Sequence, residues 1–120
     1  FAGSKDRAAI RDIVFDGLRN LRSFAHISGL SGARGVLVGR LLNAGEDVSS
    51  VFNGEGYGPL PLSDEECVVV AKPKGEMPRA VGLDVPDWLE PYFDGDDYYS
   101  LLKMRAPRDL RLYFRKSNLT

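Results

Sequence analysis

Basic side chains near the C-terminal end are the residues of this chain best suited to a chemical role. Residues 103–120 hold six Lys and Arg residues against one Asp, with Tyr113 and Phe114 among them. Guanidinium groups bind phosphate, and aromatic rings stack on unpaired bases, so the pattern indicates contact with RNA. The alternative is a solvated strand face whose cations pair with the acidic stretch 84–97. The candidate RNA-binding residues of this segment are Arg108, Arg111, Arg115 and Lys116.

A second, weaker group of cations lies near the N-terminal end. Arg7, Arg11 and Arg22 fall on nearly one side of a predicted helix. Aspartates alternate with these arginines, which is more typical of a surface with i, i+4 ion pairs than of an RNA site. Arg7 and Arg11 are therefore further but weaker candidates for contact with RNA phosphates.

Other kinds of chemistry find little support in the residue types. The single histidine, His26, is expected to pack or cap rather than act as a base. The single cysteine, Cys67, precedes three valines and is expected to be a small core residue rather than a nucleophile. The acidic residues of 94–97 lack the spacing of a calcium loop. We expect no catalytic, cofactor-binding or metal-binding residue, and thus a binding module rather than a complete enzyme.

The overall composition hides the segregation of charge. The 120 residues include 16 Lys and Arg and 17 Asp and Glu, a net charge of −1 that argues against a strongly basic nucleic-acid binder. Residues 1–45, however, hold seven basic and three acidic residues, whereas residues 46–66 hold six acidic and no basic ones. The net charge averages basic and acidic segments and does not exclude RNA binding.

Compartment and chain organisation follow from a few further features. The apolar run Val68–Ala71 is far too short to cross a bilayer, so no membrane association is expected. One cysteine cannot form an internal disulfide, which fits a reducing, cytoplasmic compartment. The chain starts at Phe1 and stops directly after a strand-like run, so we expect it to be part of a longer protein.

The elements that must position these residues are mostly helical. Apolar residues recur at three- and four-residue steps from the possible cap Ser4 to about His26, which predicts one amphipathic helix of about six turns. Gly45 ends a second predicted helix. The helices are predicted at about residues 4–26, 33–44, 47–52, 63–72, 86–93 and 96–104, followed by a strand at 110–115.

Glycine and capping signals separate these elements. The stretch 54–62 holds three glycines and two prolines and predicts a loop, and residues 73–78 predict a turn-rich linker. Ser63 and Glu66 have the spacing of a capping box, which favours a helix over the strand that the valines at 68–70 would also allow. Gly35 and Gly39 lie four residues apart and would let another helix approach closely.

Three stretches of the chain, in order, carry a resemblance to a known family: residues 6–16, DRAAIRDIVFD, residues 85–89, VPDWL, and residues 105–112, RAPRDLRL. They resemble, in turn, the opening helix, the Pro-x-Trp-Leu segment and the Ala-Pro-x-x-Leu-Arg-Val-Asn segment of the N-terminal region of bacterial Sun/RsmB-type RNA cytosine-5 methyltransferases. Lys116 matches the basic residue that follows, whereas Tyr113 stands where the family has Asn. The resemblance covers roughly residues 3–118.

This resemblance implies a domain organisation. Residues 1–72 would be a NusB-like helical RNA-binding bundle, residues 73–106 a linker with additional helices, and residues 107–120 the first strand of a truncated RNA-binding subdomain. In the family, a methyltransferase domain comes next, binds S-adenosylmethionine and uses two cysteines. That domain is absent from this chain, and Cys67 matches neither catalytic motif. The whole protein would be an enzyme, whereas this part is expected to be non-catalytic.

The expected partners follow from the same resemblance. They are ribosomal RNA and, within the whole protein, the methyltransferase domain. The alternative is a NusB-like helical protein–protein interaction domain without a methyltransferase partner, since the acidic residues 46–66 would suit a basic protein. Steep loss of RNA affinity with salt would favour the first interpretation, because an apolar protein interface is less sensitive to salt.

Overall fold

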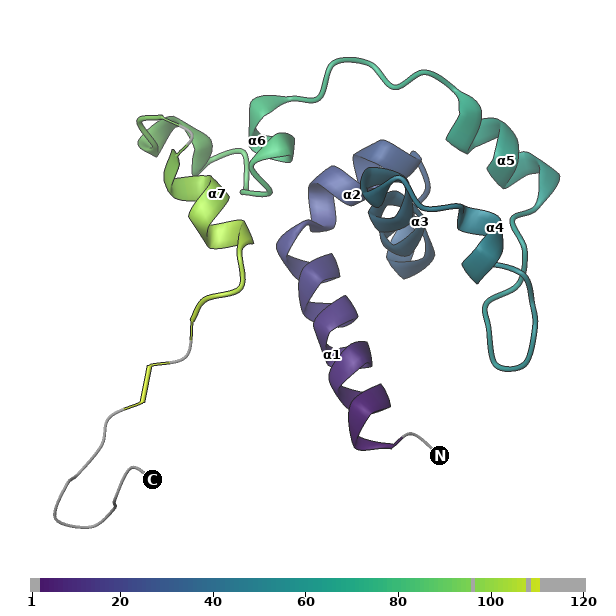
Figure 1. Ribbon diagram of the computed structural model, residues 1–120. Helices are drawn as coiled ribbons and strands as arrows, with labels where there is room; N and C mark the ends of the chain where they lie inside the picture. Colours follow the sequence, from purple (N-terminus) through teal and green to yellow (C-terminus); the bar gives the residue numbers. More distant parts are fainter. Residues whose placement is uncertain (1–2, 96, 108, 111–120) are drawn as a thin grey trace, which may run out of the picture.

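The computed structural model describes residues 3–95, 97–107 and 109–110. Within these ranges the chain is mostly helical and contains no strand, which confirms the predicted fold class at that level. The strand predicted at residues 110–115 lies, after Leu110, outside the described residues. Figure 1 shows α2 and α3 at the centre, with residues 72–78 arching over them from α5 to α6.

The first predicted helix is in fact two. Helix α1 spans Ser4–Arg19 and α2 spans Leu21–Ser28, so the prediction of one helix to about His26 was wrong. The chain bends at Asn20, whose backbone has φ −120° and ψ 29°. The side-chain amide of Asn20 donates to the carbonyl oxygen of Asp16 at 3.0 Å. The side chain thus competes with the backbone N–H groups of the helix for this acceptor. The N-cap is also one residue earlier than predicted, at Gly3.

Helix α3, Gly32–Ala44, packs against α2 (Figure 1), and Gly39 lies at the closest approach to the α2 backbone among its glycines. A Cβ atom on Gly39 would lie 1.9 Å from the carbonyl oxygen of Phe24, and one on Gly35 would lie 2.3 Å from that of Leu30. Only glycine permits these approaches. The predicted close approach of another helix is confirmed at Gly39, whereas Gly35 meets Leu30, which lies between α2 and α3. Gly45 ends the helix in the left-handed region, at φ 70°, as predicted.

The main core lies beside this helix pair. Val38 and Leu41 of α3 pack with Phe52, which follows the short helix α4, Val48–Val51. Asp47 caps α4 by accepting a hydrogen bond from the Ser49 N–H at 3.1 Å. The predictions of helices at 33–44 and 47–52 are therefore confirmed to within about a residue.

Helix α5, Asp64–Ala71, follows the glycine-rich loop and begins at the predicted capping box. The Ser63 hydroxyl accepts from the Glu66 N–H at 3.2 Å, and the Glu66 carboxylate accepts from the Ser63 N–H at 2.9 Å. The strand alternative for the valines was therefore wrong.

Cys67 does not lie in the core. The structure leaves it exposed in α5, which corrects the prediction of a buried core residue. Val70, one turn later, packs against the core cluster, whereas Cys67 borders a solvent-open groove of about 320 Å³ beside Phe52 and Leu62. A short helix that packs along one side cannot bury all of its apolar residues.

The C-terminal elements are shorter than predicted. A helix expected at 86–93 is a turn followed by the 3-10 helix η1, Glu90–Tyr92. Pro91 has no N–H to donate, so an α-helical ladder cannot continue through it. The one-turn helix α6, Arg79–Gly82, was not predicted, whereas α7, Asp97–Lys103, confirms the last predicted helix.

A buried carboxylate ties these elements to the central helices. The Asp84 side chain is 4% exposed and accepts from the Lys103 ammonium group at 2.7 Å. It also accepts from the backbone N–H of Ser23 at 2.8 Å and from its hydroxyl at 2.7 Å. Because Asp84 joins α2 to the end of α7, the segment after α7 is placed beside α1.

Across the described ranges, no helix has the length and apolarity that a bilayer crossing requires.

Candidate nucleic-acid interface

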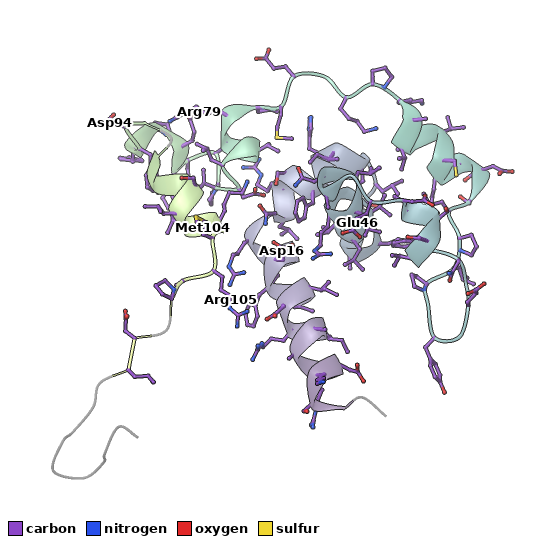
Figure 2. The ribbon with its side chains drawn as sticks, in the orientation of Figure 1. Asp16, Glu46, Arg79, Asp94, Met104 and Arg105 are labelled. Carbon is purple, nitrogen blue, oxygen red and sulfur yellow. The ribbon has the colours of Figure 1, made fainter. Side chains whose placement is uncertain are left out.

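A cationic groove of about 370 Å³ lies between α1 and the segment that follows α7. Figure 2 shows the Arg105 side chain reaching from this segment toward α1. The groove contains three arginines and one aspartate, so its formal charge is positive. Its lining residues are Arg11, Asp12, Phe15, Arg19, Arg105 and Ala106.

Asp12 lies between two guanidinium groups. One oxygen of its carboxylate accepts from Arg11 Nη2 and the other from Arg105 Nη1, each at 3.3 Å. The Arg11 and Arg105 side chains are 46% and 57% exposed, and exposed ion pairs of this kind contribute only about 0–1 kcal/mol each. Breaking either ion pair therefore costs the fold little and leaves a guanidinium group open to another anion.

An aromatic ring stands next to these cations. Phe15 is 50% exposed, and the guanidinium carbon of Arg19 lies 5.9 Å from the centre of its ring. Arg11, Phe15 and Arg19 are spaced i, i+4, i+8 and so follow one face of α1. The groove thus combines cationic groups with a flat apolar surface, the two features with which proteins bind single-stranded nucleic acid.

The sequence candidates divide into three groups in the structure. Arg11 lines the groove, and Arg7 is exposed one turn earlier on α1. Arg22 was counted among the basic residues of the first helix, but it binds the carbonyl oxygen of Val85 and, at 2.8 Å, the Asp87 carboxylate. The third group lies outside the described residues and consists of Arg108, Arg111, Arg115 and Lys116.

The ion pairs of α1 differ from those predicted. The helix was expected to hold i, i+4 pairs, but the described residues pair Asp12 with Arg11 and Arg105, and Asp16 with Arg40 at 2.7 Å. Arg105 was not among the candidate site residues predicted from the sequence. Its position in the basic C-terminal run was the available signal, but its approach to α1 depends on the packing of α7.

A second groove opens on the neighbouring face of α1. It has a volume of about 210 Å³, lies against α3 and is almost wholly apolar. The periodicity of α1 predicts a stripe that faces a core, yet Val14 and Leu18 are more than half exposed. The groove is lined by Ile13, Val14, Gly17, Leu18, Leu21, Ala33, Val36 and Leu37.

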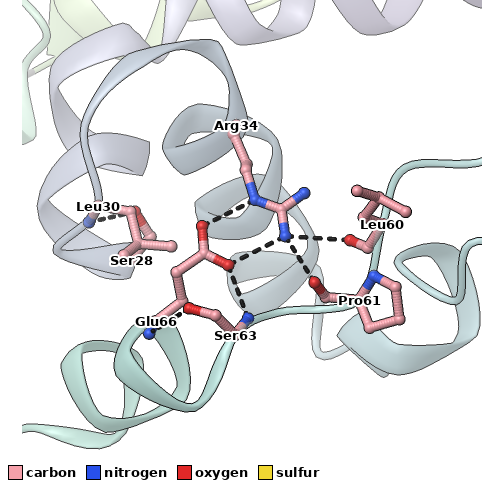
Figure 3. A network of polar contacts seen from close by, with 7 residues as sticks. All are labelled: Ser28, Leu30, Arg34, Leu60, Pro61, Ser63 and Glu66. Atoms are coloured by element: carbon pink, nitrogen blue, oxygen red, sulfur yellow. Dashed lines mark hydrogen bonds and ion pairs between the residues drawn. The ribbon is translucent and has the colours of Figure 1, made fainter.

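A separate polar network, between α3 and the start of α5, is structural (Figure 3). Arg34 donates to the Glu66 carboxylate at 2.8 and 3.0 Å, and to the carbonyl oxygens of Leu60 and Pro61 at 3.0 and 2.9 Å. The hydrogen bonds from Arg34 and from the Ser63 N–H lower the pKa of Glu66 from 4.5 to about 2. Because these contacts engage the Arg34 donors, Arg34 is a poor candidate for phosphate binding.

His26 contacts the segment between α5 and α6. Its Nε2 atom lies 3.3 Å from the carbonyl oxygen of Gly75, and the residue is half-buried. The described residues bring together no group of three or more His, Cys, Asp or Glu side chains that could hold a metal ion.

Comparisons of the chain with protein-family models, with curated proteins and with solved structures found no match.

Proposed function

We propose that this chain is the RNA-recognition N-terminal part of an S-adenosylmethionine-dependent rRNA cytosine-5 methyltransferase. In this proposal residues 1–72 form a NusB-like bundle and residues 107–120 begin an RNA-binding subdomain with a strand. The observation that carries the proposal is the cationic groove, where Arg11 and Arg105 meet from distant parts of the sequence. It adds a site on described residues to the sequence resemblance.

The groove would bind RNA through its phosphates. Arg11 and Arg105 would exchange the shared Asp12 carboxylate for phosphate oxygens, which guanidinium groups bind through paired hydrogen bonds. Arg108 follows Arg105 by three residues, and Arg111, Arg115 and Lys116 would continue the basic surface along the chain. Arg7, one turn before Arg11 on α1, would extend it at the other end.

Methyl transfer itself belongs to a different domain in this proposal. A domain that binds S-adenosylmethionine would supply the methyl group and the cysteine chemistry, in the cytoplasm. In this proposal no catalytic step belongs to the residues of this chain, whose described part consists of helices, turns and loops.

Binding of a single-stranded rRNA oligonucleotide, measured by fluorescence anisotropy, tests the proposal. Arg11→Glu and Arg105→Glu should each weaken binding by about 10- to 100-fold, because a hydrogen bond to a charged group contributes about 1.5–3 kcal/mol. Lys72→Glu is the matched control, since Lys72 is exposed at the end of α5, away from the groove. Equal affinities of all three variants would contradict the proposal.

The apolar groove favours a second function, a protein–protein interaction domain. Its lining is almost free of polar atoms, so a protein segment with apolar side chains would bind there without phosphate contacts. Leu18→Glu should abolish such binding and leave RNA affinity unchanged, because Leu18 does not line the cationic groove. A partner captured in high salt by the wild-type chain but not by Leu18→Glu would favour this second function.

A further inference from the structure

We propose that Phe15 and Arg19 form a stacking platform that makes the cationic groove selective for unpaired RNA bases. This inference rests on the proposed function and deepens it, because it names the form of RNA that the groove takes. The platform adds base contact to the phosphate contacts of Arg11 and Arg105. Phe15 and Arg19 were not among the sequence candidates.

The exposure of Phe15 is the first observation. A phenylalanine that serves only stability is normally buried, yet Phe15 is 50% exposed and lines the cationic groove. The ring is not part of the apolar groove either, whose lining includes Ile13, Val14 and Leu18 but not Phe15. Its exposure therefore belongs to the cationic groove, where the remaining lining is mostly charged.

The arrangement around the ring is the second observation. Arg19 lies one turn after Phe15, with its guanidinium carbon 5.9 Å from the ring centre, and Arg11 lies one turn before it. One helical turn is about 5.4 Å, so each of the two arginines lies about one turn from the ring along α1. A base stacked on the ring or on the Arg19 guanidinium plane would thus keep its phosphate within reach of Arg11 or Arg105.

Stacking of this kind distinguishes single strands from duplexes. In a double helix the base faces are already stacked on one another, so only an unpaired base can offer its face to Phe15. Phosphates are present in both forms, and arginines alone would bind both. The ring therefore supplies selectivity for unpaired nucleotides, without reading the sequence, because every base has a stacking face.

The test compares a single-stranded oligonucleotide with a fully paired hairpin of equal phosphate number. Phe15→Leu removes the ring but keeps an apolar side chain, and should weaken binding of the single strand by about 5- to 100-fold, the effect of one lost stacking contact. Binding of the hairpin should stay within twofold. Phe15→Trp should restore affinity for the single strand, which shows that the ring matters rather than the fold.

Tyr57→Leu is the matched control, because Tyr57 is a fully exposed aromatic residue in the glycine-rich loop, away from the groove. This control should bind both RNAs as the wild type does. The inference is overturned if Phe15→Leu binds the single strand like the wild type while Arg11→Glu and Arg105→Glu lose affinity. In that case the groove binds phosphates only, and the proposed function stands. Equal loss for both RNAs would also overturn it. If the arginine variants bind as Lys72→Glu does, the proposed function fails as well.

Discussion

The contact between α2 and α3 leads to a specific stability prediction for Gly39→Ala. The new Cβ would lie 1.9 Å from the carbonyl oxygen of Phe24, about 1 Å inside the 3.0 Å that real Cβ atoms keep. The opposing atom belongs to the backbone, so no side-chain rotation relieves the clash and the two helices must separate. Overpacking costs about 1–3 kcal/mol or more, and separation also opens the core beside Val38.

The expected net effect is a loss of about 2 kcal/mol in the free energy of unfolding, after the helix propensity of alanine returns about 1 kcal/mol. That loss corresponds to a fall in Tm of about 8–16 °C, measured by circular dichroism at 222 nm. Gly17→Ala is the matched control, because its Cβ would meet only a methyl group of Val36, at 3.4 Å, an ordinary van der Waals distance. It should keep or raise Tm. A Gly39→Ala protein that melts at or above the wild-type Tm would refute the helix contact.

Three further outcomes concern single side chains. The pKa of Glu66 is about 2 in the folded chain and ordinarily 4.5, so the ionised side chain stabilises the fold above pH 4.5 and loses this effect as the pH falls toward 2. The difference in free energy of unfolding between the wild type and Glu66→Gln, measured with urea, should therefore shrink over that pH range. The exposed Cys67 thiol should react with Ellman's reagent, one thiol per chain, without denaturant. Asp84→Asn keeps the backbone geometry at φ 55° but weakens the tie to Lys103, and should cost about 1–3 kcal/mol by urea unfolding.

Each of these outcomes has a control and a contrary result. Glu65→Gln, in the same helical turn as Glu66, should leave the pH dependence of stability unchanged; a constant Glu66→Gln difference from pH 6 to pH 2 would contradict the Arg34 contact. Cys67→Ser gives the reagent blank, and a thiol that reacts only in urea would show that Cys67 is buried. Asp87→Asn is the control for Asp84→Asn, since its carboxylate is largely exposed. Equal stabilities of these two variants would contradict the role of Asp84.

Local signals predicted the elements well wherever a cap or a stop residue was present. Ser63 with Glu66 fixed the start of α5, and Gly45 fixed the end of α3. The break at Asn20 was missed because apolar residues keep the helical period straight through it. The burial of Cys67 was misjudged because period alone does not say which side of a short helix meets the core.

The candidate site was only partly predictable, for a related reason. The basic character of the C-terminal run and the candidacy of Arg11 could be read from residue types. The meeting of Arg105 with Asp12, 93 positions apart in sequence, depends on Asp84 and Lys103 fixing the end of α7. No local sequence pattern predicts such a long-range ion pair. Phe15 was missed although it lies outside the predicted apolar stripe of α1 and one turn from both Arg11 and Arg19, a signal that was present in the sequence.

The salt dependence of RNA binding tests the central claim most directly. The dissociation constant for a single-stranded rRNA oligonucleotide is measured from 50 to 300 mM KCl for the wild type, for the double variant Arg11→Ala/Arg105→Ala and for Lys72→Ala. Each lost phosphate contact lowers the slope of log Kd against log salt by about 0.7 for a single strand, so the double variant should lose about 1.4. Lys72→Ala should keep the wild-type slope. Identical slopes for all three proteins would contradict the assignment of the groove to RNA phosphates.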